Sequence, residues 1–187
     1  MPETVSNKNE LRRALLAERQ AIAAEVRKQW DSEIAVRLIA WWDAHQVRSL
    51  GVYWPIRSEP DLRQAYTELS ARGVQLALPV VVDNDSPLKF IAWRPGDPTT
   101  KDAFGVAIPV SGEEIQPEAL LIPCVGFNAL YYRLGYGGGF YDRTLAQSPR
   151  PRTVGVGYSC GFAAFDADSH DVALDAVITE KTSIELN

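Results

Sequence analysis

The chain has 187 residues, of which 46% are hydrophobic, as is typical of one globular domain with a sizeable core. Its net charge of −5 gives no basic excess for gripping a nucleic-acid backbone. No apolar run reaches the ~18 residues that span a bilayer, and the N-terminus lacks the apolar core of a signal peptide. We therefore expect a single domain over residues 1–187, in the cytoplasm, without a nucleic-acid or membrane partner.

The N-terminal part is predicted to be helical. An amphipathic helix is expected over residues 7–28, with Ser6 or Asn7 as its N-cap, and a second helix over residues 31–44. Four apolar residues recur at helical spacing on one face of the first helix: Leu11, Leu15, Ile22 and Val26.

Strands and helices then alternate along the chain. Strands are predicted over residues 49–54, 74–82, 88–93, 119–125, 153–158 and 176–179. Helices are predicted over residues 61–71 and 140–146. The run 119–125 is almost entirely apolar, which indicates a central strand buried on both faces. The alternation predicts a three-layer α/β fold, with a mostly parallel sheet and helices on both faces.

The strongest chemical signal is the segment RLGYGGGFYDR, residues 133–143. Its glycines permit positive φ and let a ligand approach the peptide N–H groups, which can form a concavity for phosphate. Arg133 and Arg143 flank the loop with positive charge, and Asp142 adds a carboxylate for a phosphate-bound Mg²⁺. The loop is neither a Walker A motif nor a good dinucleotide fingerprint. Phosphate binding is therefore predicted from the glycines and the flanking charges, and not from a match to either motif.

Three flanking features extend this hypothesis. Lys8 and Arg12 share one helix face and are suited to phosphates, although a solvated charged face has the same pattern. Trp54 and Glu59 follow a predicted strand, where a ligand-facing ring and acid, or a core aromatic and a turn carboxylate, are both expected. Near the C-terminus, Asp175 is a candidate second magnesium carboxylate.

Histidine and cysteine chemistry is not indicated. His45 and His170 are the only histidines, which excludes a metal cage built from histidine. Cys124 and Cys160 have no zinc-site spacing and suit a reducing compartment.

In this order, these pieces resemble the 5-formyltetrahydrofolate cyclo-ligase family. The resemblance is most specific over residues 123–145, PCVGFNALYYRLGYGGGFYDRTL, where the glycine run is followed by an aromatic-Tyr-Asp-Arg ending. The remaining matches, which extend it over nearly the whole chain, are Lys8-x-x-Leu11-Arg12, Glu59 and the segment from His170-Asp171 to Asp175. Two residues depart from many relatives, which carry Asp at Asn128 and a smaller aliphatic residue at Trp54.

The resemblance implies a NagB/RpiA/CoA transferase-like scaffold, Mg²⁺ as cofactor and ATP as co-substrate. The implied reaction closes 5-formyltetrahydrofolate, with or without a polyglutamate tail, to 5,10-methenyltetrahydrofolate, releasing ADP and phosphate. In this reaction the formyl oxygen is phosphorylated and N10 attacks the carbon. A monomer is expected.

The family's functional positions can be carried over to this sequence. Catalytic roles are implied for Arg133 and Tyr141. ATP contacts are implied for Lys8, Arg12, Arg133, Leu134, Gly135, Tyr136, Gly137, Gly138, Gly139, Phe140 and Tyr141. Folate contacts are implied for Arg12, Trp54, Glu59, Tyr136, Gly138 and Phe140. Magnesium carboxylates are implied at Asp142 and Asp175.

Two other classes of function remain open on the residues alone. A sugar-phosphate isomerase-like or CoA-transferase-like enzyme would use the glycine loop for a substrate phosphate and need no ATP. A regulatory or carrier module would bind folate or nucleotide without turnover. A test of ATP-dependent turnover distinguishes the cyclo-ligase from the isomerase-like or transferase-like enzyme and from the binding module.

Overall fold

The computed structural model describes the backbone of residues 4–185 and the side chains of residues 8–185. The helices are α1 (Thr4–Ala21), α2 (Ala24–His45), α3 (Arg63–Ala71), α4 (Phe140–Leu145) and a short 3₁₀ turn, η1 (Ser159–Gly161). The strands of the central sheet are β1 (Ser49–Gly51), β2 (Gln75–Val80), β3 (Lys89–Ala92), β6 (Glu114–Ile115), β7 (Ala119–Pro123), β10 (Arg152–Val156), β11 (Ala176–Ile178) and β12 (Ser183–Glu185). Two small hairpins consist of β4 (Thr99–Lys101) with β5 (Ala107–Pro109), and β8 (Gly126–Phe127) with β9 (Arg133–Leu134).

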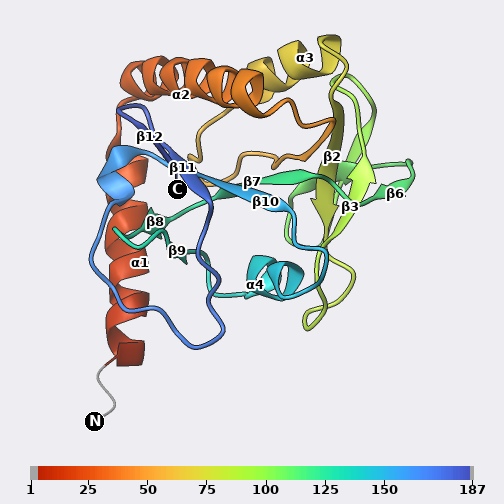
Figure 1. Ribbon diagram of the computed structural model, residues 1–187. Helices are drawn as coiled ribbons and strands as arrows, with labels where there is room; N and C mark the ends of the chain where they lie inside the picture. The colour runs from red at the N-terminus through yellow and green to blue at the C-terminus, as the bar shows by residue number, and fades with distance from the viewer. Residues whose placement is uncertain (1–3, 186–187) are drawn as a thin grey trace.

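The central sheet has eight strands in the order β12-β11-β10-β7-β1-β2-β3-β6 (Figure 1). The five strands from β11 to β2 run parallel, and β12, β3 and β6 pair antiparallel at the two edges. β7 lies in the middle and is buried over Ala119–Ile122, as its apolar sequence predicts. The expectation of a mostly parallel sheet is confirmed.

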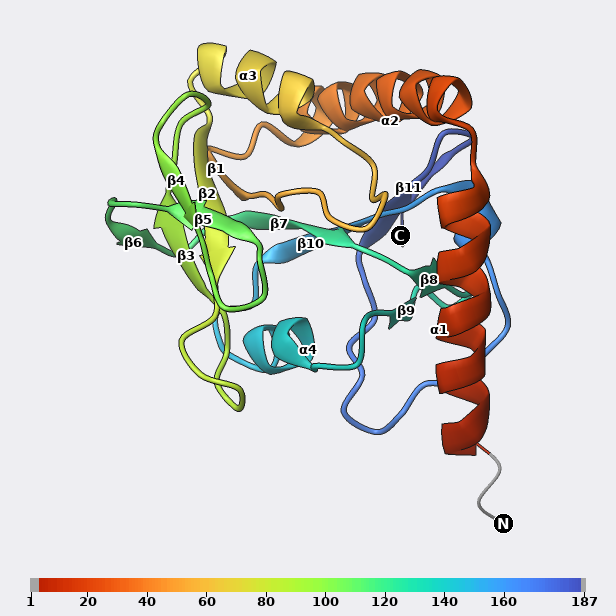
Figure 2. The ribbon, with the colours of Figure 1, turned by 180° about the vertical axis from the view of Figure 1, so that it is seen from behind.

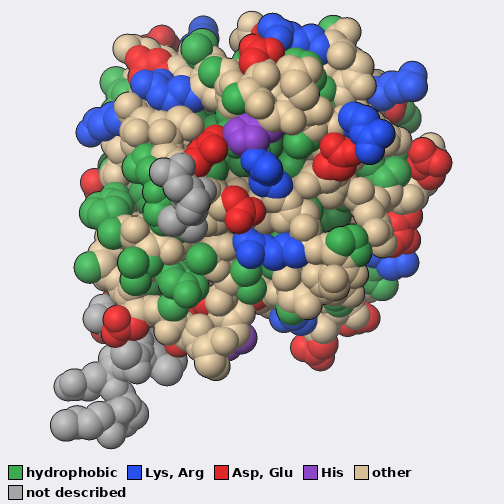
Figure 3. All heavy atoms as spheres, in the orientation of Figure 1, with side chains coloured by type: hydrophobic (Ala, Val, Ile, Leu, Met, Phe, Trp, Pro, Cys, Tyr) green, Lys and Arg blue, Asp and Glu red, His purple; other side chains and the backbone are tan. Residues whose placement is uncertain are grey.

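Helices cover both faces of this sheet (Figures 1 and 2). On one face, α2 and α3 pack their apolar sides against the strands; α2 buries Ile34, Leu38, Trp41 and Trp42. On the other face, the short α4 contributes Leu145 to a second core cluster that includes Leu120 and Ile122 of β7. The outer surface in the view of Figure 3 mixes charges of both signs, without a basic patch.

The predicted boundary between the first two helices is wrong. A helix over residues 7–28 was expected, but α1 ends at Ala21 and α2 begins at Ala24, because Ala23 takes an extended conformation with ψ 143°. The break lets α2 lie across the sheet while α1 stands beside it (Figure 1). Val26 consequently leaves the apolar face and is 40% exposed. The side chains of the expected caps, Ser6 and Asn7, lie outside the described residues.

Several strand ends also differ from the prediction. The strand expected over 49–54 pairs as β1 only to Gly51, and Val52 donates one further hydrogen bond to the Ala77 carbonyl oxygen, 2.9 Å away. Beyond it, Tyr53 and Trp54 leave the sheet to line a pocket. The short strands β4, β5, β6, β8, β9 and β12 were not predicted, because two or three residues carry too little periodicity.

Among the helices of residues 4–185, none is long and apolar enough to cross a membrane.

Candidate active site

A pocket of about 600 Å³ opens where the parallel strands end. β1 and β7 are parallel, so Trp54 and Pro123, which follow and end these strands, meet at the same edge of the sheet, and both line the pocket. The glycine loop, the N-terminal part of α1, the tip of the β4–β5 hairpin and the loop before β11 supply the remaining walls. In α/β folds this edge is the usual ligand position.

The glycine loop connects β9 to α4, so the predicted order of loop and helix is confirmed. Gly137 and Gly139 have φ of +98° and +70°, values that side chains other than glycine rarely adopt. With Gly138 between them, they present bare backbone to the pocket. An exposed run of peptide N–H groups of this kind is suited to phosphate oxygens.

The backbone conformation of Gly137 provides a direct test of this loop. We expect Gly137→Ala to weaken nucleotide binding about tenfold, because alanine at this φ carries ~1–3 kcal/mol of strain that the loop relieves by moving. Gly135→Ala is the matched control, since φ of Gly135 is not in the positive range and an added Cβ there would have no neighbouring atom within 4 Å. Titration of each variant with ATP, alongside its melting temperature, checks the prediction; equal affinities for the two variants would contradict it.

Helix α1 brings two cations to the pocket. Lys8 Nζ lies 2.6 Å from Asp168 Oδ2 and 3.3 Å from Asp171 Oδ2. Burial alone would lower the pKa of Lys8, but the two carboxylates outweigh this effect and raise the pKa. Arg12 Nε donates to the Gly135 carbonyl oxygen at 2.8 Å, which fixes the helix to the glycine loop. Lys8 and Arg12 both line the pocket, and their binding of phosphate stays a prediction.

Arg133 and Asp142 form a bidentate ion pair on the pocket wall. The two guanidinium nitrogens lie 3.0 and 3.2 Å from the two carboxylate oxygens, and the Arg133 side chain is only 7% exposed. The same guanidinium lies 5.5 Å from the ring centre of Tyr141, whose pKa is raised, mainly by burial. Arg133, Tyr141 and Asp142 therefore stand together, as the sequence predicts. Arg143 does not join them; it donates to backbone oxygens of residues 84 and 86.

Asp175 lies away from this pocket, contrary to expectation. It precedes β11 at the amino end of the parallel strands, the edge of the sheet opposite Asp142, and its Oδ2 accepts hydrogen bonds from the backbone and hydroxyl of Thr153. The pocket instead receives Asp171, four residues earlier, with Asp168 and His170. One potential ligand atom from each of these three residues lies within 4.8 Å of the others. Asp175 therefore does not share a pocket with Asp142, and Asp171 lines that pocket instead.

On the other side of the pocket, Glu59 is almost completely buried, with 4% exposure. Its Oε2 accepts a hydrogen bond from the Ile56 backbone at 2.9 Å, and its Oε1 accepts one from the Tyr136 hydroxyl at 2.8 Å. Burial raises the pKa of Glu59, and the two hydrogen bonds together with the charges of Arg19 and Arg57 act in the opposite direction. Trp54 lines the same side.

Two features of the pocket were not predicted from the sequence. Phe104, at the tip of the β4–β5 hairpin, lies edge-on to Phe140 at 6.2 Å and is 60% exposed at the pocket mouth. Arg19 of α1 is buried beneath Tyr136. A signal for Arg19 was present, because it falls on the same helix face as Lys8 and Leu15, where an apolar residue is expected.

A mostly parallel sheet with a pocket at the carboxyl ends of its strands is typical of α/β enzymes. A sequence profile of the 5-formyltetrahydrofolate cyclo-ligase family matches residues 4–180. The chain belongs to this family, and it is a ligase of folate metabolism.

Individual relatives support the assignment. The chain is 32% identical to 5-formyltetrahydrofolate cyclo-ligase of Mycoplasma pneumoniae, over 94% of this chain and 99% of that protein. It is 30% identical to the cyclo-ligase of Mycolicibacterium smegmatis, over 95% and 96% of the two chains. The solved structure of Aquifex aeolicus 5,10-methenyltetrahydrofolate synthetase superposes with a TM-score of 0.82 at 31% identity, covering 95% of this chain and 92% of that one. The Mycoplasma pneumoniae synthetase structure gives 0.79 at 27% identity, over 92% and 98% of the chains.

Proposed function

We propose that this enzyme converts 5-formyltetrahydrofolate and ATP to 5,10-methenyltetrahydrofolate, ADP and phosphate, with Mg²⁺ as its cofactor. The observation that carries the proposal is that one pocket is lined by two kinds of residues, which we assign to two halves of the pocket. One half combines a bare glycine backbone with Lys8, Arg12 and Arg133. The other half combines the buried Glu59 with Trp54. A nucleotide and a pterin have the matching chemistry.

The reaction needs activation because a formamide oxygen is a poor leaving group. The formyl oxygen attacks the γ-phosphorus, the bond from that phosphorus to the ADP oxygen breaks, and ADP leaves. N10 then attacks the activated formyl carbon, the bond from that carbon to the phosphorylated oxygen breaks, and phosphate departs with the electron pair. The N10 proton passes to solvent. Phosphoryl transfer of this kind depends on positioning and charge neutralisation more than on a protein nucleophile.

The nucleotide half supplies positioning and positive charge. The peptide N–H groups of Gly137–Gly139 bind phosphate oxygens. Lys8 and Arg12, which project from α1, neutralise the negative charge of the phosphates. Arg133 has N–H donors beyond the two that it gives to Asp142, and these stabilise charge on the transferred phosphoryl group. Tyr141 supports the Arg133 guanidinium with its ring.

The pocket fits Mg²⁺, a hard cation that takes one or two carboxylates together with phosphates and waters. The donor set is oxygen-rich, because Asp142 and Asp171 line the same pocket and Asp168 lies beside Asp171. We assign Asp142 and Asp171 to the ion, with Asp168 adjacent. When bound, Mg²⁺ neutralises phosphate charge and orients the transferred group. Lys8 and Arg133 balance these carboxylates in the described structure.

The folate half recognises the pterin by its donor edge. A 2-amino-4-oxopyrimidine ring presents two neighbouring N–H groups, and an ionised carboxylate accepts both. Each Glu59 oxygen already accepts one hydrogen bond and has a lone pair left for the substrate. Trp54, Tyr136 and Phe140 provide aromatic surface for the flat ring.

The direct test is the absorbance of methenyltetrahydrofolate with purified protein, 5-formyltetrahydrofolate and Mg²⁺. We expect a rise only when ATP is present, with one ADP released per ring closed. ATP binding without a rise would support a binding module instead. No ATP binding would support the isomerase-like alternative.

Four further proposals concern the extent of the domain, the type of scaffold, the oligomeric state and the location of the enzyme. We propose that residues 1–187 act as one catalytic domain, that the scaffold is of the NagB/RpiA/CoA transferase type, and that the enzyme is a monomer. A cytoplasmic location agrees with the two free thiols, Cys124 and Cys160. Sedimentation of the purified protein checks the monomer.

A further inference from the structure

Arg19 of α1 is a buried cation that lies under Tyr136, on the wall of the folate half of the pocket. Its residue exposure is 4%, the same as that of Glu59. A buried guanidinium is costly unless its donors are satisfied. The chain therefore holds two buried, opposite charges beside one pocket wall, and their contacts show how each is compensated.

The guanidinium of Arg19 connects three segments. Nε donates to the Arg57 carbonyl oxygen at 3.1 Å, Nη1 to the Cys124 carbonyl oxygen at 3.4 Å, and Nη2 to the Tyr136 hydroxyl at 2.6 Å. Arg57 lies in the turn after β1, Cys124 follows β7, and Tyr136 lies in the glycine loop. None of the three acceptors is a carboxylate, so Arg19 reaches its counter-charge indirectly.

The connection runs through one phenol oxygen. Because Tyr136 accepts from Arg19, its own hydroxyl hydrogen is free to donate to Glu59 Oε1 at 2.8 Å. The chain Arg19–Tyr136–Glu59 therefore has a fixed direction, from cation to carboxylate. Hydrogen bonds polarised at both ends by charges are stronger than neutral ones.

Arg19 also holds the turn that carries Glu59. In this turn Arg57 and Ser58 have φ of +47° and +61°, a conformation that non-glycine residues rarely adopt. Such a conformation persists only where surrounding contacts impose it. The hydrogen bond from Arg19 to the Arg57 carbonyl oxygen is one of these contacts.

We propose that Arg19 is a positioning residue for folate recognition: it orients the Tyr136 hydroxyl and keeps Glu59 ionised and aimed at the pterin. The proposal rests on the pterin role proposed above for Glu59. It assigns to α1 a second task besides nucleotide binding, because Lys8 and Arg12 of the same face serve the phosphate half.

The expected pH dependence follows from the charges around Glu59. An ionised Glu59 binds the pterin, so folate affinity is present above its pKa and is lost as the pH falls through it. Burial raises this pKa and the positive charge of Arg19 lowers it. Removing Arg19 therefore moves the loss of affinity to higher pH. The titratable and charged groups that face Glu59 are Arg19, Tyr53, Arg57, Tyr66, Cys124, Tyr136 and Tyr141.

The test measures 5-formyltetrahydrofolate binding without ATP, as a function of pH, so that it does not depend on turnover. We expect Arg19→Met to weaken folate binding at neutral pH roughly tenfold or more, to shift the acid limb to higher pH, and to leave ATP affinity within about twofold. Arg19→Lys keeps the charge and should retain the acid limb near its original position. Arg13→Met is the matched control, since Arg13 is exposed on the same helix.

A double-mutant cycle separates positioning from general support. If Arg19 acts through Glu59, Arg19→Met should have little further effect in a Glu59→Gln background, a loss of about twofold or less. An equal loss in both backgrounds, or an unmoved acid limb in a folded Arg19→Met protein, would overturn the inference. Unaltered folate binding by Arg19→Met, in a protein whose parent closes the folate ring with ATP, would overturn it while leaving the proposed reaction intact.

Discussion

Asp171→Asn is expected to raise the Mg²⁺ concentration needed for half-maximal ring closure by at least 10- to 100-fold. Losing an outer-sphere partner of a metal ligand typically costs that factor, and Asp171 is assigned to the ion itself. The amide is uncharged, so it cannot replace the carboxylate that faces a doubly charged cation. Titration of activity with Mg²⁺ and of the protein–ADP complex with Mn²⁺, followed by electron paramagnetic resonance, measures the effect in two ways.

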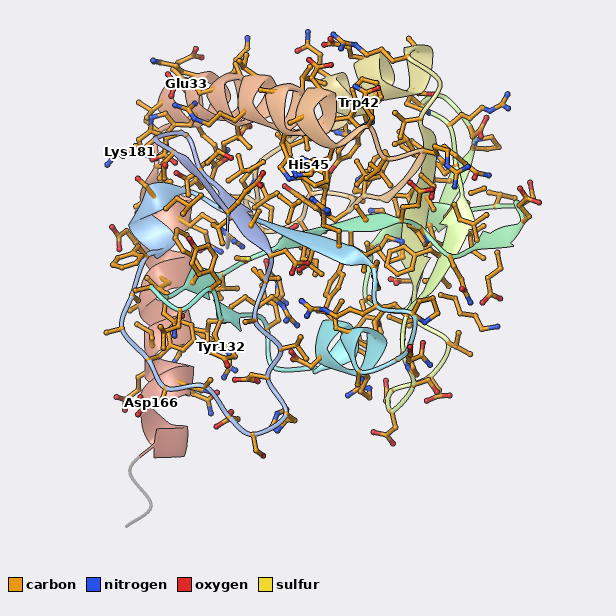
Figure 4. The ribbon with its side chains drawn as sticks, viewed as in Figure 1. Glu33, Trp42, His45, Tyr132, Asp166 and Lys181 are labelled. Carbon is orange, nitrogen blue, oxygen red and sulfur yellow. The ribbon has the colours of Figure 1, made fainter. Side chains whose placement is uncertain are left out.

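Asp166→Asn serves as the control for this variant. Asp166 belongs to the same loop before β11, is exposed (Figure 4), and lies outside the pocket wall. The Asp166→Asn variant should leave the Mg²⁺ titration of activity and the Mn²⁺ titration of the protein–ADP complex unchanged. Asp142→Ala should resemble Asp171→Asn. An Asp171→Asn enzyme with the Mg²⁺ and Mn²⁺ dependence of the unaltered protein would show that the metal binds elsewhere.

Glu59→Gln is expected to raise KM for 5-formyltetrahydrofolate by about 10- to 150-fold, the equivalent of ~1.5–3 kcal/mol for a hydrogen bond to a charged group. Glutamine has nearly the same shape, but one of its ends donates where the pterin edge also donates. The variant should also lose the acid limb of folate binding that the raised pKa of Glu59 produces. Steady-state kinetics with each substrate varied in turn, between acid and neutral pH, check both points.

The affinity for ATP provides the internal control for Glu59→Gln. Glu59 lies on the folate half, so the dissociation constant for ATP should change little. Glu59→Gln leaves the buried guanidinium of Arg19 without its counter-charge, which lowers the free energy of unfolding, so the melting temperature is measured beside the kinetics. A Glu59→Gln enzyme with normal folate KM, or one that loses both substrates equally, would contradict the assignment of this residue to the pterin.

Local sequence patterns determined most of the scaffold and the position of the glycine loop. The apolar run 119–125 had to be a buried strand, and the glycines at 135–139 had to be a loop with little side-chain bulk. Both features depend on neighbouring residues only, which is why they could be predicted. Helix α1 could be predicted for the same reason, although its end at Ala21 could not. No proline or glycine marks that break, and the packing of α2 across the sheet sets it.

The tertiary structure alone decided which distant residues share the pocket. Asp171 and Asp175 are close in sequence and chemically identical, but Asp175 turns toward Thr153 at the amino end of the sheet while Asp171 reaches Lys8. The contact of Arg19 with Tyr136 joins residues 117 positions apart. Such pairings depend on where strands and loops lie in space, and local periodicity carries no record of that. The sequence by itself thus determined the types of groups available, and the fold determined which of them meet.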